Sequence, residues 1–340
     1  MASSPRLRPP VQVALLQYTR EGPRLVAAAA RITVSKKPLS SAWNMSGKDV
    51  EKWIRELIRR GHGSPLEHSV YTFEAECSRV CSHQLVRHRL ASYTQQSMRH
   101  TEGFLRAAVL RVCSLLGRRC PQRPGGAGGH RAYADALRAA LDEAERGRVG
   151  WAELAAAASE AFVFNPGWSG DVLARYARAY LAAAAEYYEA LSKHIPKEDA
   201  RMLLPQAVRT RIVFTMNARE LLESFLPLRM CSHAQWEIRM LAWKVQALLE
   251  QVHPEIFSYA GPRCVLQENR LRDEPCRLRD YLAGRCGFTQ PRCPELVPRQ
   301  GIPSCLAYAA ASSGAIAEPA GSRPADTRGV HAEPRGQARA

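Results

Sequence analysis

The sequence lacks the features of a membrane-spanning or exported chain. It has no window of about 20 uncharged apolar residues, which a transmembrane helix requires. Residues 1–10 are basic and rich in Pro, but the apolar run at 11–16 is too short for the core of a signal peptide, and no cleavage site follows it. We therefore expect no membrane association and a reducing, cytoplasmic location.

Three common motifs are also missing. The chain has no GxGxxG turn, no GxxxxGKS/T loop and no GxSxG elbow. The most common devices for holding a nucleotide or activating a serine are therefore absent, and any nucleotide site must be built differently.

The metal motifs are incomplete. His62, Glu67 and His68 would form an HxxEH zinc motif only if residue 64 were His, and it is Ser. The ten Cys stand in a long chain without a secretory signal, so they predict no disulfide framework. The Cys beyond residue 260 have irregular gaps and no CxxC pair, so we expect no metal, although a zinc site among them stays an alternative: Cys264, Cys276, Cys286, Cys293 and Cys305.

Lysine is scarce, because only seven of the 48 basic residues are Lys, and the formal net charge is +16. This excess of Arg implies anionic partners such as phosphates, nucleotides or nucleic acid. Enrichment in Arg, Ala, Gly and Pro is also typical of a GC-rich coding sequence, and much of the surplus lies in the tail. Charge alone therefore does not make nucleic acid an expected partner.

Hydrophobic patterns predict strands and helices. The apolar run at 11–18 fits a buried strand, and residues 70–77 alternate as in a half-buried strand. Ser46 resembles the N-cap and Gly61 the C-cap of a helix around residues 50–58. Further helices are expected at residues 23–32, 78–86, 131–146, 151–164 and 173–191, and a capping box of Ser232 and Gln235 predicts another behind Ser232.

Two regions depart from this pattern. Residues 107–130 interrupt it, with a Gly- and Pro-rich loop or disordered link at 120–129, and we interpret 107–170 as a largely helical surface insertion. After Pro262 the chain is rich in Arg, Pro, Cys and Gly, and from about residue 310 its composition is typical of disorder.

The segment from Arg87 to Arg99 is the most informative part of the chain. Its thirteen residues contain three Arg, one His, two Gln and Ser97, and no carboxylate. Guanidinium forks match phosphate oxygens, while hydroxyl and carboxamide groups bond carbonyl and imide edges. The segment therefore predicts a site for an anionic, planar ligand, with a solvated Arg-rich loop as the alternative.

The same segment resembles the signature of flavin-dependent thymidylate synthases: Arg-His-Arg at 87–89, seven further residues, Ser97, and Arg99 two positions on. Other blocks resemble the family in the expected order, at residues 62–68, 199–205, 215–222 and 228–238. The resemblance covers roughly residues 11–106 and 171–260.

The resemblance implies an α/β (α+β) fold, a central mixed sheet flanked by helices, in a catalytic domain at 1–260 followed by an Arg-, Pro- and Cys-rich, partly disordered tail at 261–340. It implies conversion of dUMP to dTMP with methylenetetrahydrofolate as the one-carbon donor, NADPH as the reductant and FAD carrying the hydride. It also implies a homotetramer with sites built from several subunits.

Residue roles follow from the resemblance in the same way. FAD would contact Ser64, Arg87, His88, Arg89, Gln95, Asn217, Arg219 and His233. The substrate dUMP would contact Gln84, Arg87, Gln95, Gln96, Ser97, Arg99, Arg201 and Arg229. For Asn217 and His233, capping of a helix N-terminus is an alternative or additional role.

Arg229 and Ser97 are the candidate catalytic residues. Arg229 would stabilise charge on the uracil ring, although a salt bridge to Glu237 or Glu223 is the alternative. A serine nucleophile needs an adjacent base, and His88 lies nine residues away with a ligand role of its own. We therefore assign Ser97 to orienting dUMP, and covalent catalysis is the minority hypothesis.

Two positions depart from the family pattern. Gln95 stands where the family often has a carboxylate, and Glu223–Ser224 stand where it often has Asn or His. Two alternatives therefore remain open: a member of the family that has lost activity, and an Arg-rich nucleic-acid-binding protein on the same fold without catalytic activity.

Overall fold

The computed structural model describes residues 6–36 and 38–314. These residues divide into two compact units, each made of two stretches of chain. Unit 1 contains the described residues up to Gly22 and Leu66–Glu220, and unit 2 contains those in Pro23–Pro65 and from Leu221 onward. The units are interleaved along the chain, whereas the sequence suggested a catalytic domain before residue 260 and a tail after it. No helix of the described residues is both long and apolar enough to cross a membrane.

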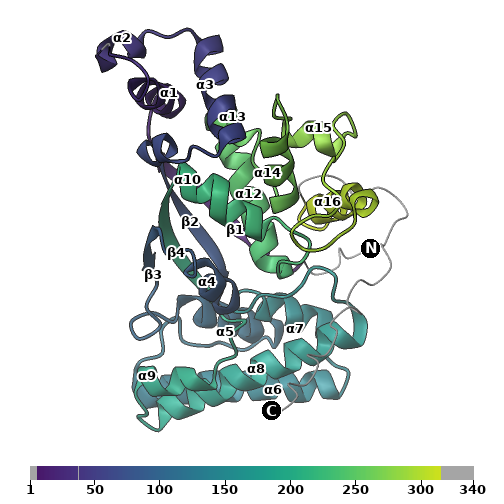
Figure 1. The fold of residues 1–340 in the computed structure, drawn as a ribbon. Helices are drawn as coiled ribbons and strands as arrows, with labels where there is room; N and C mark the ends of the chain where they lie inside the picture. The colour runs from purple at the N-terminus through teal and green to yellow at the C-terminus, as the bar shows by residue number, and fades with distance from the viewer. Residues whose placement is uncertain (1–5, 37, 315–340) are drawn as a thin grey trace, which may run out of the picture. The chain divides into compact units, whose positions relative to one another are not determined.

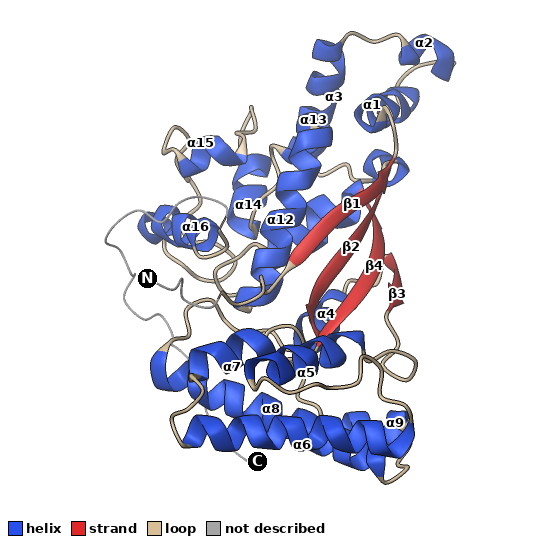
Figure 2. Cartoon of the chain, turned by 180° about the vertical axis from the view of Figure 1, so that it is seen from behind, coloured by secondary structure: helices blue, strands red, loops and turns tan. Residues whose placement is uncertain are grey.

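Unit 1 is built on a four-stranded sheet with the order β1-β2-β4-β3 (Figure 2). The strands are β1 (Gln12–Tyr18), β2 (Val70–Ser78), β3 (Ala91–Gln95) and β4 (Arg209–Asn217). The α/β class is confirmed, but the sheet is antiparallel throughout rather than mixed. Alternating side chains mark a strand but carry no information on the direction of its partner, so this detail was not readable from the sequence.

The buried face of the sheet lies on the two central strands, β2 and β4, whereas no residue of β1 is buried, so the buried strand expected at residues 11–18 forms but is not buried. The side chains of Tyr71, Phe73, Ala75 and Cys77 on β2 have no exposed surface, which confirms the half-buried strand. Phe73 stacks on Phe214 of β4, directly opposite in the register, with ring centroids 5.1 Å apart. Such cross-strand aromatic pairs stabilise the central strand pair.

Helices form the second part of unit 1. They are α4 (Arg79–Leu85), α5 (Gly103–Leu115), α6 (Gly126–Glu145), α7 (Trp151–Ala158), α8 (Gly170–Ser192), α9 (Lys197–Ala200), the 3-10 turn η2 (Arg201–Leu203) and α10 (Ala218–Glu220). Helices α6 and α8 lie side by side (Figure 1). Their shared core includes Tyr133, Leu137, Leu181 and Tyr188, all fully buried.

The interruption of regular structure expected at residues 107–130 is shorter than predicted at both ends. Helix α5 continues to Leu115, and α6 begins at Gly126, inside the stretch expected to be a loop. Gly weakens a helix by its own propensity, but the buried face of α6, with Tyr133 and Leu137 packed in the helical core, offsets that cost. Tertiary packing therefore overrode local composition.

The absence of disulfides was also wrong. Cys113 is bonded to Cys120 in unit 1, and Cys276 to Cys286 in unit 2. Each pair closes a short loop, seven and ten residues apart in sequence. Intracellular proteins of hyperthermophiles are an exception to the rule that disulfides mark export, so the bonds do not by themselves define a compartment.

Unit 2 is helical. Its elements are α1 (Gly22–Ile32), α2 (Leu39–Trp43), α3 (Gly47–Arg60), the π-helical turn η3 (Leu221–Phe225), α11 (Leu226–Arg229), α12 (Trp236–Val252), α13 (Pro254–Phe257), α14 (Arg263–Leu271), α15 (Leu278–Leu282), the 3-10 turn η4 (Arg299–Gly301) and α16 (Ile302–Ala311). A 3-10 turn, η1 (Ser64–His68), lies at the boundary between the units. The region beyond residue 260 thus contains three helices, and residues 315–340, where we expected disorder, lie outside the described residues.

The helix caps confirm one prediction and correct another. The Ser46 side chain accepts a hydrogen bond from the Asp49 amide, and Gly61 has a φ of 68°, so α3 has the expected ends. Helix α12, in contrast, is capped by Gln235, whose side chain accepts from the Glu237 and Ile238 amides. The helix therefore begins at Trp236, and the capping box at Ser232 was wrong.

A buried guanidinium joins three segments of unit 1. The side chain of Arg209, at the start of β4, is fully buried and donates to the carbonyl oxygens of Ser159 (2.8 Å), Pro9 (3.0 Å) and Arg8 (3.2 Å). It also contacts the carboxylate of Glu76 on β2 at 3.3 Å. The guanidinium itself is shielded from water, so these four contacts together compensate for the burial of its charge.

We expect Arg209→Ala to lower the free energy of unfolding by about 3–5 kcal/mol, because it removes a fully buried guanidinium together with its hydrogen bonds to three carbonyls and its contact with Glu76. Arg211→Ala, which removes a half-exposed guanidinium 3.5 Å from the same carboxylate, is the matched control and should cost below about 1 kcal/mol. Urea denaturation of both variants tests this difference. Equal losses would show that Arg209 does not join the segments as described.

Candidate functional site

The Arg87–Arg99 segment is held in shape by a tyrosine. It connects α4 to β3, and the Tyr93 hydroxyl lies 2.8 Å from the carbonyl oxygens of both Leu85 and His88. Burial, with a contribution from Glu220, raises the pKa of this phenol, so it stays a protonated donor. The turn that carries the Arg-His-Arg triplet is therefore closed by one side chain.

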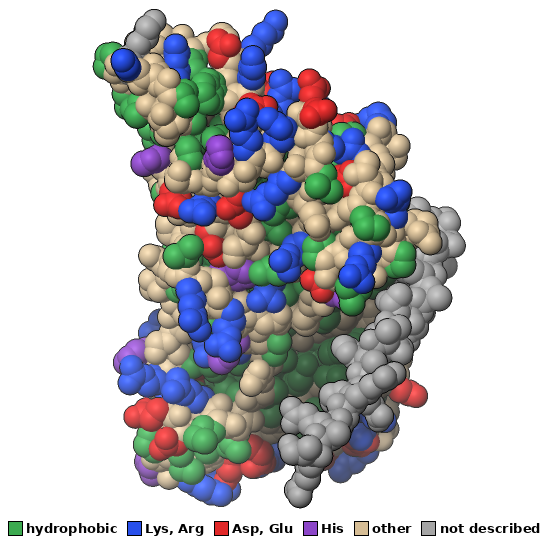
Figure 3. Space-filling model, viewed as in Figure 1, with side chains coloured by type: hydrophobic (Ala, Val, Ile, Leu, Met, Phe, Trp, Pro, Cys, Tyr) green, Lys and Arg blue, Asp and Glu red, His purple; other side chains and the backbone are tan. Residues whose placement is uncertain are grey.

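Within the triplet the side chains alternate in direction. His88 is only 4% exposed, and its Nδ1 lies 3.3 Å from the Glu220 carboxylate in α10. Arg87 and Arg89 are exposed, and neither forms an ion pair with a described carboxylate. Figure 3 shows Lys, Arg and His side chains gathered over the part of unit 1 around α4 and β3. The sequence thus presents two unneutralised guanidiniums on a turn anchored by a buried His–Glu contact.

The three Gln residues of this region occupy half-buried positions. Gln95 donates from Nε2 to the hydroxyls of Ser82 (2.9 Å) and Thr210 (3.1 Å), and Gln96 donates to Thr101 at 3.2 Å. Gln84 lies on α4 and is half-buried. The Gln95 side chain thus bonds neutral hydroxyls, which require no negative charge at this position.

Ser97 begins the turn that ends the segment. Its hydroxyl oxygen accepts from the Arg99 amide at 3.3 Å, and its carbonyl accepts from the amides of His100 and Thr101. Among the described residues, no imidazole or carboxylate hydrogen-bonds to this hydroxyl. The arrangement orients the Ser97 side chain but does not activate it as a nucleophile. Arg99 is exposed and, like Arg87 and Arg89, unpaired with any described carboxylate.

A second cationic group lies elsewhere in unit 1. Arg201, the first residue of η2, is exposed and donates to the Glu198 carbonyl. Burial, together with the nearby charge of Arg201, lowers the pKa of Arg79 at the start of α4. Arg79 also lies 3.2 Å from His83 Nε2. Two guanidiniums that repel each other form a favourable place for a phosphate.

The remaining candidates of unit 1 lie where β4 ends. Asn217 accepts a hydrogen bond from the Glu220 amide at 2.8 Å, so the expected capping role is confirmed. Arg219 is exposed and pairs with Glu67 of η1 at 2.5 Å. Both side chains thus lie beside the start of α10, whose Glu220 contacts His88.

In unit 2, Ser64 lines a cavity. This cavity has a volume of about 590 Å³ and lies between α1 and α3, with His62, Trp53, Leu57 and Pro65 among its walls. Cavities of roughly 300–1,000 Å³ with apolar walls and a few polar groups are typical of small-molecule sites. The Ser64 side chain is exposed toward solvent.

Arg229 is the last residue of α11 and is half-buried. The π-helical turn η3 precedes α11, and such turns occur often at functional sites. Glu223, one proposed partner of Arg229, pairs with Arg270 at 2.8 Å. His233 is exposed, and the cap of α12 is Gln235, so His233 is not the capping residue.

Comparison with known proteins shows which family the chain resembles. The family model of thymidylate synthase complementing proteins matches residues 14–255. A flavin-dependent thymidylate synthase of Aeropyrum pernix is 50% identical over 307 residues, which cover 88% of this chain and 93% of that protein. The enzyme of the same name from Sulfolobus acidocaldarius is 37% identical over 302 residues, covering 87% and 94%.

The chain belongs to the flavin-dependent thymidylate synthase family. A solved relative is a UMP/dUMP methylase from Streptomyces cacaoi with 5-Br dUMP bound, at a TM-score of 0.51 and 25% identity over 74% of this chain and 94% of that one. The resemblance read from the sequence is therefore confirmed, as is the expectation that the chain is an enzyme.

Three residues that contact or lie near the candidate site residues were not predicted from the sequence. Arg79 has no motif of its own, because its proximity to Arg201 joins positions 122 residues apart in sequence. Glu220 reads as an ordinary helix former, yet it contacts His88. Tyr93 lies within the family signature, but its sequence position does not show that its hydroxyl bonds to the carbonyls of Leu85 and His88. Long-range contacts of this kind leave no local pattern.

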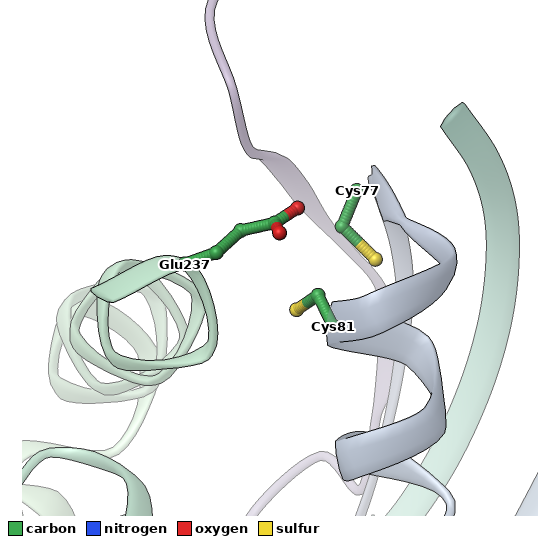
Figure 4. A group of neighbouring side chains, drawn as sticks. All are labelled: Cys77, Cys81 and Glu237. Carbon is green, nitrogen blue, oxygen red and sulfur yellow. The ribbon is translucent and has the colours of Figure 1, made fainter. Parts of the chain in front are cut away.

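One group of side chains could hold a metal ion by composition. Figure 4 shows Cys77, at the end of β2, and Cys81, on α4, which are both fully buried, together with Glu237 of α12. Cys77 and Cys81 belong to unit 1 and Glu237 to unit 2. Within unit 1 alone, two thiols do not complete the four ligands of a structural zinc site.

We expect Tyr93→Phe to lower the free energy of unfolding by about 1–2 kcal/mol, because two partly buried carbonyl oxygens lose their donor. Amide hydrogen exchange of His88 should accelerate beyond the change in global stability, because the turn itself loosens. Tyr176→Phe, whose ring stacks on Trp168, is the control and should change stability by less than about 0.5 kcal/mol. Unchanged exchange at His88 would contradict the proposed closure of the turn.

Proposed function

We propose that this protein converts dUMP to dTMP, with FAD as cofactor, methylenetetrahydrofolate as one-carbon donor and NADPH as reductant. The observation that carries the proposal is the set of exposed, unneutralised guanidiniums on the anchored segment between α4 and Arg99. Membership of the family and the dUMP analogue bound to the Streptomyces relative support it.

The residues present fit a flavin dinucleotide. The guanidinium groups of Arg87 and Arg89 have no competing carboxylate among the described residues. Each can therefore bind two oxygens of a pyrophosphate. Ser64 belongs to the wall of the cavity in unit 2, and Asn217, Arg219 and His233 are the other proposed contacts. When bound, the flavin supplies the hydride chemistry that no amino-acid side chain provides. His88 is buried against Glu220, so its contact with FAD is the least supported of these assignments, and we assign it to positioning the two guanidiniums.

The proposed dUMP contacts separate into two kinds. Arg99 and Arg201 bind the phosphate, and Arg79 adds a third charge beside Arg201. Gln84, Gln95, Gln96 and Ser97 supply the neutral donors and acceptors that orient the nucleoside. The hydroxyl of Ser97 has no base within hydrogen-bond reach among the described residues, which favours orientation over covalent attack.

Arg229 is proposed to stabilise the transition state of the reaction. Its guanidinium would lie at the uracil edge and balance the negative charge that develops on the ring when the pyrimidine carbon attacks the one-carbon donor. Glu223, the alternative partner of Arg229, also pairs with Arg270 at 2.8 Å. The π-helical turn η3 directly precedes α11, the short helix that ends at Arg229.

Two further features are carried over from the family as proposals. The active enzyme is a homotetramer, in which neighbouring subunits complete each site, and it acts in the cytoplasm. Gel filtration with light scattering tests the assembly directly, and a monomer that is fully active would contradict it.

We expect Arg229→Ala to retain bound flavin but to lower turnover at least about 10²-fold, because a donor that acts mainly in the transition state is lost. Tritium release from labelled dUMP measures the turnover. Arg285→Ala, which removes an exposed guanidinium of unit 2 paired with Asp280, is the control and should remain active. Full turnover by Arg229→Ala would refute the assigned role.

Arg89→Ala should lose flavin during purification, with affinity reduced about tenfold or more, because a charge-assisted hydrogen bond to phosphate is removed. Flavin absorbance per chain is the measurement, and Arg111→Ala, an exposed guanidinium paired with Glu160, is the control. An unchanged flavin content would contradict the pyrophosphate assignment.

The same preparations separate the other hypotheses. A wild-type protein that is colourless and binds nucleic acid with steep salt dependence would favour a nucleic-acid-binding protein. A flavin-bound protein that is well expressed but fails to rescue a thymidine-requiring bacterial strain would favour a member that lost activity through Gln95 or Glu223.

A further inference from the structure

Four cysteines from separate segments of unit 2 converge on one cavity. Cys231 follows α11, Cys264 lies on α14, Cys293 lies in the loop before η4, and Cys305 lies on α16. All four thiols are free, whereas the other two cysteines of unit 2, Cys276 and Cys286, form a disulfide. These four line the same cavity, and three of them lie beyond residue 255, where the family model ends.

The cavity is apolar apart from its sulfurs. Pro262, Val297, Ile302 and Leu306 form part of its wall, and the centre of a water molecule could occupy about 20 Å³ of it. A single water requires roughly 10–15 Å³ by this measure, so the space exceeds one water. Burial raises the pKa of the Cys264 thiol, and the neighbouring Cys231, Cys293 and Cys305 raise it further, so the four groups lie within electrostatic reach of one another.

A buried cation lies beside the same thiols. Arg239 on α12 is 5% exposed and makes no ion pair with a described carboxylate, and its Nε has no hydrogen-bond partner. Burial lowers its pKa, while Tyr308, Cys231 and Cys305 act in the opposite direction, which places Arg239 near two of the four thiols. A buried charge without a counter-ion is costly, so an anionic group is expected in its surroundings.

The spacing of the sulfurs decides between the two common tetrathiolate groups. Around a single zinc ion, four thiolates at about 2.3 Å from the metal lie about 3.8 Å from one another. No three of these four sulfurs, all of them in described residues, lie within 4.8 Å of one another. In a cubane iron–sulfur cluster each thiolate binds a different iron, so the sulfurs lie roughly 6 Å apart.

We propose that Cys231, Cys264, Cys293 and Cys305 bind a 4Fe–4S cluster. Its thiolate-ligated core is anionic and supplies the missing counter-ion of Arg239, and the Ser232 hydroxyl, 2.9 Å from the Cys305 sulfur, is a hydrogen-bond donor to one ligand. The cluster has a structural role: it joins α14, α16 and the intervening loop to the loop that begins two residues after Arg229. The site does not depend on the proposed reaction.

The test begins with wild-type full-length protein produced and purified without oxygen. Iron and acid-labile sulfide analysis should each give about four atoms per chain, before or after reconstitution with ferrous iron and sulfide. Mössbauer spectroscopy should identify the cubane. Because bound flavin also absorbs visible light, these measurements, rather than colour, report the cluster, and they separate its absence from failure to bind flavin.

Variants then identify the ligands. Cys231→Ala, Cys264→Ala, Cys293→Ala and Cys305→Ala should each hold less iron and sulfide per chain than the wild type, because each removes one of the four thiolate ligands of the cluster. The double variant Cys276→Ala/Cys286→Ala is the matched control: it also removes thiols from unit 2 but should keep its iron. Circular dichroism checks that each variant folds.

Three results would overturn the proposal. One equivalent of zinc without iron or sulfide would show a single-ion site. Wild-type protein that holds neither metal after anaerobic reconstitution would show no site at all. Disulfides among the four cysteines under the same conditions would show that they pair with each other. All three results are measured on the wild-type protein. The proposal can therefore be refuted even if a variant fails to fold.

Discussion

The arrangement of unit 1 depends on one buried guanidinium. Arg209 hydrogen-bonds to the carbonyls of the N-terminal segment and of Ser159, and it contacts Glu76 on the central strand pair. These groups come from stretches up to about 200 residues apart in the chain. Because the guanidinium is fully buried and cannot exchange these partners for water, they hold the start of β4 against the end of the helical layer. The proposed phosphate residues Arg79 and Arg201 both lie near this junction in the chain, just before and after the strands it joins.

The guanidiniums of the proposed site are exposed and have no carboxylate partner nearby in the sequence. From residue 77 to residue 101 the sequence has no Asp or Glu, so Arg87, Arg89 and Arg99 have no local partner. The carboxylate that does approach the segment, Glu220, is placed against His88 rather than against an arginine. The Tyr93 hydroxyl closes the turn with a neutral group. Rigidity is thus supplied by buried contacts, and the guanidiniums stay available for anionic ligands.

Unit 2 shows the opposite use of polar groups. Its free cysteines face an apolar cavity rather than solvent, and Arg239 is buried without a carboxylate. Free thiols pack in such a cavity as small apolar groups, but a buried cation without a counter-ion is unfavourable. An anionic cluster bound by the four thiolates would supply that counter-ion. The cluster would connect the region beyond residue 255 to the loop after α11, the helix that ends at Arg229.

The sequence alone determined the local features of this protein. The strands at β1 and β2, the caps of α3, the long helix α8 and the family signature were all readable, because each depends on residues a few positions apart. Three things were decided only by tertiary structure: the antiparallel sheet, the helix that begins at Gly126, and the inward direction of His88. The convergence of four irregularly spaced cysteines belongs with them. Each depends on contacts between segments that are distant in the sequence. Such contacts produce no regular spacing of residue types along the chain.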